Sequence, residues 1–204
     1  QFLGVAEQAG LMVPLGEWIL RQACLDAAAW PAHVRVAVNM SAAQFHRSNV
    51  LDVVLCALVE SGLSPERLEL EIPDAALLDG NLAAHLLTVR QLKNLGVGVV
   101  LDNCGVGYSA ASYLQSFPFD KFKIDRAIVK DCTTRRDCAA VIASAVALAG
   151  GLGVATVAKG VETRAQFEAL QAAGVDFVEG YLFGRPVPNS EISFDLPLPA
   201  QNVA

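Results

Sequence analysis

Short runs of β-branched and other apolar residues alternate with longer helical segments along the whole sequence, and this alternation restricts the fold more than any other feature. Six runs have the length and composition of strands, namely 34–38, 68–72, 97–101, 120–124, 154–157 and 175–178. Alternation of this kind is typical of a parallel sheet, and the nearly continuous apolar character of the runs indicates that both faces are covered. A closed (β/α)8 barrel typically needs about 250 residues. Six strands in 204 residues therefore predict an α/β fold of the TIM-like (β/α)8 barrel type, truncated at the N-terminus so that the first strands are absent. An open sheet is the alternative.

The helices between these runs are marked by their caps and by their apolar faces. Ser41 with Gln44 and Thr163 with Gln166 fit the capping box, in which each side chain bonds the backbone N–H of the other residue. The helix that opens near Pro14 has four apolar residues on one face, which we expect to pack on the sheet: Leu15, Trp18, Ile19 and Ala23.

One stretch, 139–158, contains no charged residue and is long enough to cross a bilayer. It is rich in alanine, and the glycines at 150, 151 and 153 break it into a helix and a short β-rich run. We therefore expect a buried helix followed by a strand and no membrane span.

Composition indicates one domain and excludes one class of partner. Apolar residues make up 53% of the 204 residues, enough for one substantial core, so we expect a single domain over 1–204 with a C-terminal tail at 186–204. The formal charge of −6 lacks the basic excess that nucleic-acid polymers require. The five cysteines are scattered and show no metal-binding spacing. They indicate reduced thiols in a cytoplasmic protein, or in the cytoplasmic part of a membrane-anchored sensor.

Polar side chains stand where the predicted strands end, and a parallel barrel builds its active site from these ends. The residues that share this position are Asn39, Glu71, Asp102, Asn103, Lys123, Lys159 and Glu179. Amide and carboxylate oxygens suit a hard cation such as Mg²⁺ or Mn²⁺, and lysines suit phosphate. The pattern alone therefore indicates a site for a phosphate ester.

Six segments carry a more specific resemblance. They are VNMSAAQF, LELEIP, VVLDNCGVGYSAASYL, FPFDKFKIDR, VAKGVET and VEGYLFGRPVP, and their order and spacing resemble those of the EAL family. The resemblance spans nearly the whole chain and implies a TIM barrel that hydrolyses cyclic-di-GMP with two divalent metals. It implies metal ligands at Asn39, Glu71 and Asp102, a water-supporting lysine at Lys123, and a loop-steadying glutamate at Glu162.

The sequence departs from the family pattern at the metal centre. The Glu-Ala-Leu segment that gives the family its name belongs to a strand before Gln1. The family's aspartate pair is Asp102-Asn103, its general-base glutamate is Lys159, and the glutamine of its QGY segment is Glu179. Loss of a general base typically costs about 10²- to 10⁴-fold in rate. A lysine there also repels cations and should pair with Glu71 or Asp102, so Mg²⁺ or Mn²⁺, if any metal binds, should be held weakly.

Substrate contacts follow from the same resemblance. It places Phe117, Pro118, Asp125 and Arg126 in a substrate-contacting segment, together with Lys159 and Glu179. Arg126 has the alternative of a surface ion pair, and Lys159 has a second role, which is to neutralise the nucleotide's phosphates.

Three functions stay open at this point. We expect a catalytically impaired EAL domain that binds cyclic-di-GMP and acts as a regulatory module. One alternative is an active metal-dependent phosphodiesterase, and the other is a nucleotide-independent scaffold for dimerisation or partner docking. The resemblance also implies a homodimer and an upstream sensory or GGDEF-type domain.

Overall fold

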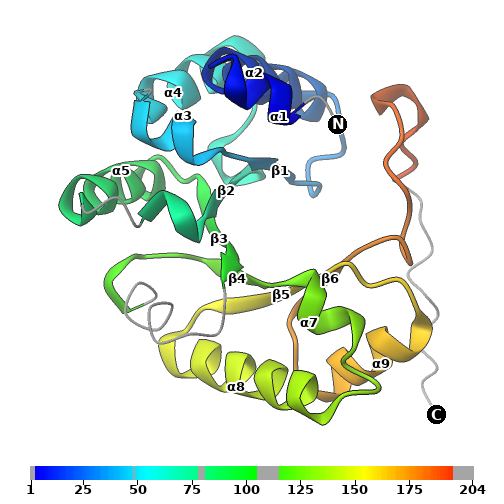
Figure 1. Cartoon of the computed structure of the whole chain (residues 1–204). Coiled ribbons are helices and arrows are strands. Elements are labelled where there is room, and N and C mark those ends of the chain that lie inside the picture. The colour runs from blue at the N-terminus through cyan, green and yellow to red at the C-terminus, as the bar shows by residue number, and fades with distance from the viewer. Residues whose placement is uncertain (1–2, 48, 78–80, 105–114, 195–204) are drawn as a thin grey trace.

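The computed structural model describes residues 3–47, 49–77, 81–104 and 115–194, and its centre is one parallel sheet. Six strands pair in chain order from β1 to β6: β1 (Val36–Asn39), β2 (Leu68–Pro73), β3 (Gly98–Cys104), β4 (Lys121–Ile124), β5 (Ala155–Lys159) and β6 (Phe177–Glu179). Each overlaps a predicted run, and the ends agree within two residues except in β3, which extends three residues farther. The curled sheet with helices outside it is the partial TIM-like barrel expected from the alternation (Figure 1).

Helices follow the strands and lie on the outer side of the sheet. Figure 1 shows the first five near β1–β3 and the last three near β4–β6. Their bounds are α1 (Leu3–Gln8), α2 (Met12–Ala28), α3 (Ala42–Arg47), α4 (Val50–Ser61), α5 (Leu82–Asn94), α7 (Arg126–Lys130), α8 (Arg136–Leu152) and α9 (Arg164–Ala172). Three short 3-10 turns are η1 (Pro65–Arg67), η2 (Asp74–Leu77) and η3 (Asn189–Glu191).

The two faces of the sheet differ, and this corrects the expectation of apolar runs on both. Successive side chains in a strand point to opposite faces. In β2, the side chains of Leu68, Leu70 and Ile72 are fully buried in the apolar core. Glu69 and Glu71 alternate with them on the other face. This face of the strand therefore carries buried charges, and burial of a charge is strongly unfavourable unless it is paired.

Both predicted capping boxes form. Gln166 N–H donates to Thr163 Oγ1 while the Gln166 side chain accepts from Thr163 N–H. Gln44 and Ser41 make the same reciprocal pair ahead of α3. Each cap fixes where a helix leaves the end of a strand.

The uncharged stretch forms helix α8 followed by β5, as expected, and of the three glycines named for the break only Gly153 makes it. Gly150 and Gly151 lie inside α8, and the helix ends at Gly153, whose φ of 68° is left-handed. Among the residues that the structure describes, no helix is long and apolar enough to cross a membrane.

Helix α2 packs with a different face from the one predicted. Trp18 is 62% exposed and Ile19 is 39% exposed, so half of the predicted stripe points outward, whereas Ala23 packs against the core. The buried face carries smaller residues, namely Gly16, Leu20, Cys24 and Ala27. A β-carbon on Gly16 would lie 1.9 Å from Gln44 Nε2. Close approach of α2 to its neighbours, and not side-chain size, therefore selects the buried face.

Candidate functional site

Charged side chains meet at the carboxyl ends of the strands, as the sequence predicted. Glu71, Asp102 and Lys123 are 4–6% exposed, whereas Lys159 and Glu179 are partly exposed at the ends of β5 and β6. Parallel pairing sets Asn39 beside Glu71 and Lys159 beside Glu179. Asn39 is exposed, and the side chain of Asn103 lies outside the described part of the chain.

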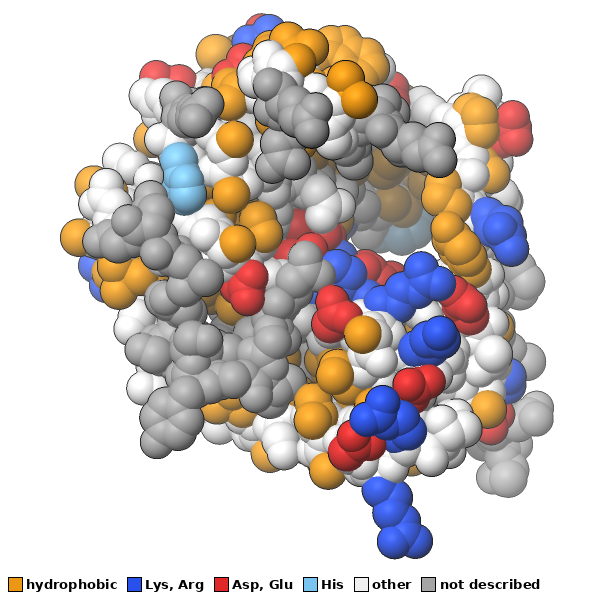
Figure 2. Space-filling model, in the orientation of Figure 1, with side chains coloured by type: hydrophobic (Ala, Val, Ile, Leu, Met, Phe, Trp, Pro, Cys, Tyr) orange, Lys and Arg blue, Asp and Glu red, His pale blue; other side chains and the backbone are white. Residues whose placement is uncertain are grey.

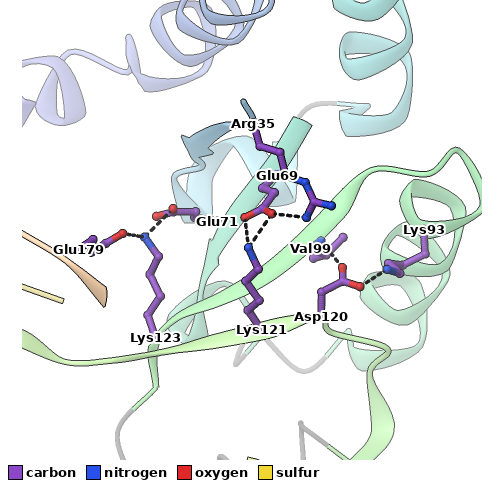
Figure 3. A network of polar contacts seen from close by, with 9 residues as sticks. All are labelled: Arg35, Glu69, Glu71, Lys93, Val99, Asp120, Lys121, Lys123 and Glu179. Atoms are coloured by element: carbon purple, nitrogen blue, oxygen red, sulfur yellow. Dashed lines mark hydrogen bonds and ion pairs between the residues drawn. The ribbon is translucent and has the colours of Figure 1, made fainter. Parts of the chain in front are cut away.

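Lys123 is the centre of the buried part of this site. Its Nζ lies 2.5 Å from Glu71 Oε1 and 2.8 Å from Glu179 Oε2, as Figure 3 shows. Burial alone would lower the pKa of Lys123, but its hydrogen bonds to Glu179 and Glu71 outweigh burial and raise the pKa. Lys123 is therefore a charged ammonium shared by two carboxylates.

Glu71 feels opposing influences. Burial raises its pKa, the contact with Lys123 lowers it, and Glu179 and Asp102 add repulsion, with a raised pKa as the net result. A raised pKa favours the neutral acid, whereas the raised pKa of Lys123 favours the ion pair. The ion pair prevails at neutral pH, because an ammonium in direct contact favours the charged carboxylate.

Lys159 makes the second ion pair of the site. Its Nζ lies 2.6 Å from Asp102 Oδ1, and the side chain of Asp102 is 8% exposed. This confirms the expectation that Lys159 pairs with Glu71 or Asp102. The ammonium occupies a carboxylate oxygen that a metal ion would need.

The described residues do not fit a two-metal centre. Lys123 and Lys159 engage Glu71 and Asp102, two of the four expected ligands; the other two are Asn39 and Asn103. Within the described ranges, no group of three or more His, Cys, Asp or Glu residues is arranged to hold a metal ion. No catalytic step through a metal is therefore assigned to this arrangement.

A cavity of about 810 Å³ opens beside these ion pairs. Its charged and aromatic lining comprises Arg126, Lys159, Glu162, Glu179, Tyr181, Phe183, Arg185 and Glu191. Figure 2 shows red and blue side chains gathered around the hollow in this region. The Arg185 guanidinium lies 4.8 Å from the centre of the Tyr181 ring. The cavity thus presents both cationic donors and carboxylate acceptors.

Two glycines let the walls of this cavity approach closely. A β-carbon on Gly160, whose φ is 72°, would lie 2.5 Å from Arg126 Cγ. A β-carbon on Gly180 would lie 2.3 Å from the backbone N and O of Val161. Val161 N–H donates to Glu179 O and Val161 O accepts from Leu182 N–H. These contacts hold the ends of β5 and β6 together under the cavity.

Residues after β4 have separate roles. Arg126 Nη2 lies 2.5 Å from Glu162 Oε1, and both side chains line the cavity. Arg126 therefore forms an ion pair and also lines the cavity, so the two interpretations of this residue do not exclude each other. Asp125 caps α7 by accepting from Ala127 N–H, which gives it a structural role in addition to the predicted contact with substrate.

Phe117 and Pro118 lie before β4, at the opposite end of the strand from Lys123. They line a smaller cavity of about 350 Å³ with Arg90 and Leu152. The Phe117 ring is 3% exposed and stacks on Phe119 with centroids 5.6 Å apart. The structure does not bring these two residues to the cavity beside Lys159.

The segment 184–194, called the arm below, is the part of the site that sequence reasoning missed. All but its first two residues belong to the predicted C-terminal tail, yet Val187, Glu191 and Ile192 line the cavity. Figure 1 shows the arm rising from β6 toward the N-terminal helices. Residues 184–188 belong to the segment VEGYLFGRPVP that carries the family resemblance, but no pattern in the sequence places 189–194 beside the strand ends.

Comparison with known proteins agrees with this geometry. The bifunctional diguanylate cyclase/cyclic di-GMP phosphodiesterase MucR of Pseudomonas aeruginosa is 39% identical over 197 residues, which cover 94% of this chain and 28% of MucR. A solved complex of the PaMucR phosphodiesterase with c-di-GMP has a TM-score of 0.86 at 39% identity, and covers 92% of this chain and 77% of that chain.

A further solved structure is a calcium and cyclic-di-GMP complex of Klebsiella pneumoniae BlrP1, with a TM-score of 0.76 at 28% identity, covering 85% of this chain and 44% of that chain. The chain spans roughly a quarter of the length of the curated relatives it matches. The EAL domain family matches residues 1–186. The chain therefore belongs to the EAL domain family.

Proposed function

We propose that this EAL domain is a regulatory module that binds cyclic-di-GMP and hydrolyses it poorly or not at all. The observation that carries the proposal is the ion pair of Lys159 with Asp102, with Nζ and Oδ1 2.6 Å apart. In this pair a fixed ammonium takes the place beside Asp102 where the family resemblance expects a general base and a metal ion.

Electrostatics explains why this lysine should impair catalysis. Two like unit charges 4 Å apart repel by about 4 kcal/mol at an effective dielectric constant of 20. A divalent cation at Asp102 would have to overcome that repulsion and displace Lys159. Lysine with a charged partner also cannot accept a proton from an attacking water.

The cavity suits a guanine dinucleotide. Its volume of about 810 Å³ lies within the roughly 300–1,000 Å³ of typical ligand pockets. Lys159, Arg126 and Arg185 can donate to phosphate oxygens, and Glu162, Glu179 and Glu191 can accept from the N–H groups of guanine. Tyr181 offers a ring for stacking.

The relatives support the same ligand and suggest partners. PaMucR was solved with c-di-GMP, and the name of MucR couples the phosphodiesterase to a diguanylate cyclase. We therefore include an upstream sensory or GGDEF-type domain in the proposal. The homodimer and the cytoplasmic location stay predictions.

Turnover tests the catalytic half of the proposal. The chain is incubated with cyclic-di-GMP and Mn²⁺ or Mg²⁺, and the linear dinucleotide product is followed by chromatography beside an equilibrium binding measurement on the same sample. Binding without product is expected. Product formed at a rate typical of a working phosphodiesterase would refute impaired catalysis and favour the active enzyme. Failure to bind would favour the nucleotide-independent scaffold.

A further inference from the structure

The arm (184–194) is fastened at its far end, away from the strands that carry it. Trp30 Nε1–H donates to Asn189 Oδ1 at 2.9 Å. The rings of Trp30 and Phe194 have their centroids 5.7 Å apart and tilt at 50°. Val187, between β6 and Asn189, and Ile192, between the two contacts, line the cavity. One aromatic side chain thus meets both ends of the segment that contains Ile192.

Trp30 itself is held rigidly from the other side. The Arg67 guanidinium donates to four carbonyls in the last turn of α2 and the connection to β1, those of Ala27, Trp30, Pro31 and Val34. The Trp30 side chain also packs against the apolar core. Trp30 is therefore a fixed anchor, whereas the arm is exposed along most of its length.

We propose that Trp30 is a positioning residue for ligand binding in this cavity, because it fastens the arm through Asn189 and Phe194 and so holds the cavity wall in place. The inference rests on the proposed function for the identity of the ligand. Trp30 does not line the cavity itself, so its effect on the nucleotide passes through the arm.

The physical reason is preorganisation. A wall that is already ordered before binding spares the ligand the entropy of ordering it. The contacts of Trp30 with Asn189 and Phe194, called the clasp below, combine one hydrogen bond and one aromatic pair. Contacts of these two kinds together correspond to about a tenfold change in an equilibrium constant, which sets the expected loss of affinity when the clasp is removed.

The test uses the full chain, with cyclic-di-GMP as the ligand and calorimetry as the readout. Asn189→Ala removes the acceptor, Trp30→Phe removes the donor, and Phe194→Ala removes the ring contact. Asn189 and Phe194 are exposed, so their variants should keep the fold. Trp18→Phe is the matched control, because Trp18 lies on the exposed face of α2 and is the only other tryptophan.

Asn189→Ala and Trp30→Phe each remove only the hydrogen bond, so each should raise the Kd about threefold. The double variant should be no weaker than either single variant, since both remove the same bond. Trp18→Phe should bind like the parent and show a change in Trp30 emission when cyclic-di-GMP is added. An unchanged Kd in Asn189→Ala and Phe194→Ala, or additive losses in the double variant, would overturn the inference.

A second readout separates this inference from the proposed function. In the Trp18→Phe background without ligand, Asn189→Ala and Phe194→Ala should each shift the Trp30 emission to longer wavelength, because the ring becomes more exposed to water. If neither the parent nor Trp18→Phe binds cyclic-di-GMP, the proposed function fails. If the emission does not shift, the clasp itself is refuted, whatever the ligand.

Discussion

The charged face of the sheet contains two layers of ion pairs, and they differ in charge balance. In the lower layer, Glu69 is contacted by Lys121 Nζ at 2.6 and 2.8 Å and by Arg35 at 3.1 Å. In the upper layer, two residues farther along the same strands, Lys123 is shared by Glu71 and Glu179. Figure 3 shows the two layers side by side. In the lower layer two cations contact one carboxylate, whereas in the upper layer two carboxylates contact one lysine.

This difference separates a structural pair from a site. The lower carboxylate has two cationic partners, so losing either one leaves it paired. The upper lysine is the shared partner of two carboxylates, and Lys159 with Asp102 completes a layer of three acids and two lysines. The upper layer borders the large cavity through Lys159 and Glu179. Its residual negative charge is what a cation or a hydrogen-bond donor on a ligand would meet.

Removing Lys123 from the upper layer or Lys121 from the lower layer should give the largest difference in stability between the two layers. Lys123→Met leaves Glu71 buried without its cation and should destabilise the fold by about 3–5 kcal/mol, the usual loss for one partner of a buried ion pair. Lys121→Met leaves Arg35 on Glu69 and should cost clearly less. Urea unfolding at neutral pH measures both. Equal losses would show that the layers do not differ.

Restoring the acid at Lys159 should convert the upper layer into a cation site. Lys159→Glu removes the competing ammonium from Asp102 and adds a ligand oxygen, so Mn²⁺ should bind about a hundredfold more tightly, equivalent to about 2.7 kcal/mol. Mn²⁺ titration by calorimetry measures the gain, and Lys121→Glu in the lower layer is the control. Equal Mn²⁺ affinity in the parent and Lys159→Glu would contradict the role given to Lys159.

The upper layer should also determine a part of the alkaline stability. The pKa of Lys123 is raised above its ordinary 10.5 in the fold. The folded state therefore holds this proton more tightly than the unfolded state. Its contribution is fully present below about pH 10.5 and is lost as pH rises through the raised pKa. Unfolding between pH 9 and 12 should show this loss in the parent and in Lys121→Met, and a shallower loss in Lys123→Met. If stability fell equally with pH in the parent and in Lys123→Met, the role of Lys123 in alkaline stability would be contradicted.

The smallest expected effect concerns the thiols outside both layers. Cys56 is exposed, whereas Cys24 is fully buried and its pKa is raised to about 11 by burial. Iodoacetamide at pH 8 should therefore modify Cys56 with little loss of stability and leave Cys24 unmodified in the folded protein. Peptide mapping by mass spectrometry distinguishes the two. Modification of Cys24 at the same rate would show that helix α2 opens readily.

The strands and most site residues could be predicted because they depend on local rules. β-Branched runs identify the strands, and parallel pairing brings their polar ends together whatever the loops do. The Lys159 pair also followed from charge, since a lysine beside acids at one sheet edge has few other partners. Position at a strand end was therefore enough to find Glu71, Asp102 and Lys123.

The features that the sequence did not predict depend on contacts between residues that are distant in sequence. The buried face of α2 is chosen by close approach at Gly16, which hydrophobicity does not reveal. The Trp30 and Asn189 bond joins residues 159 positions apart, and neither carries a motif. Phe117 and Pro118 were placed by resemblance alone, and the direction of β4 puts them at the other end of the strand.

The central claim is that Lys159 stands in place of a metal, and the dependence of nucleotide binding on chelator tests it most directly. Cyclic-di-GMP is titrated into the chain by calorimetry in Mg²⁺ and again in excess EDTA, with Lys159→Ala measured in both buffers. We expect the parent to bind equally well, within about twofold, in the two buffers, and Lys159→Ala to bind about tenfold more weakly in both. Binding that disappears in EDTA, or that is unchanged in Lys159→Ala, would contradict the claim.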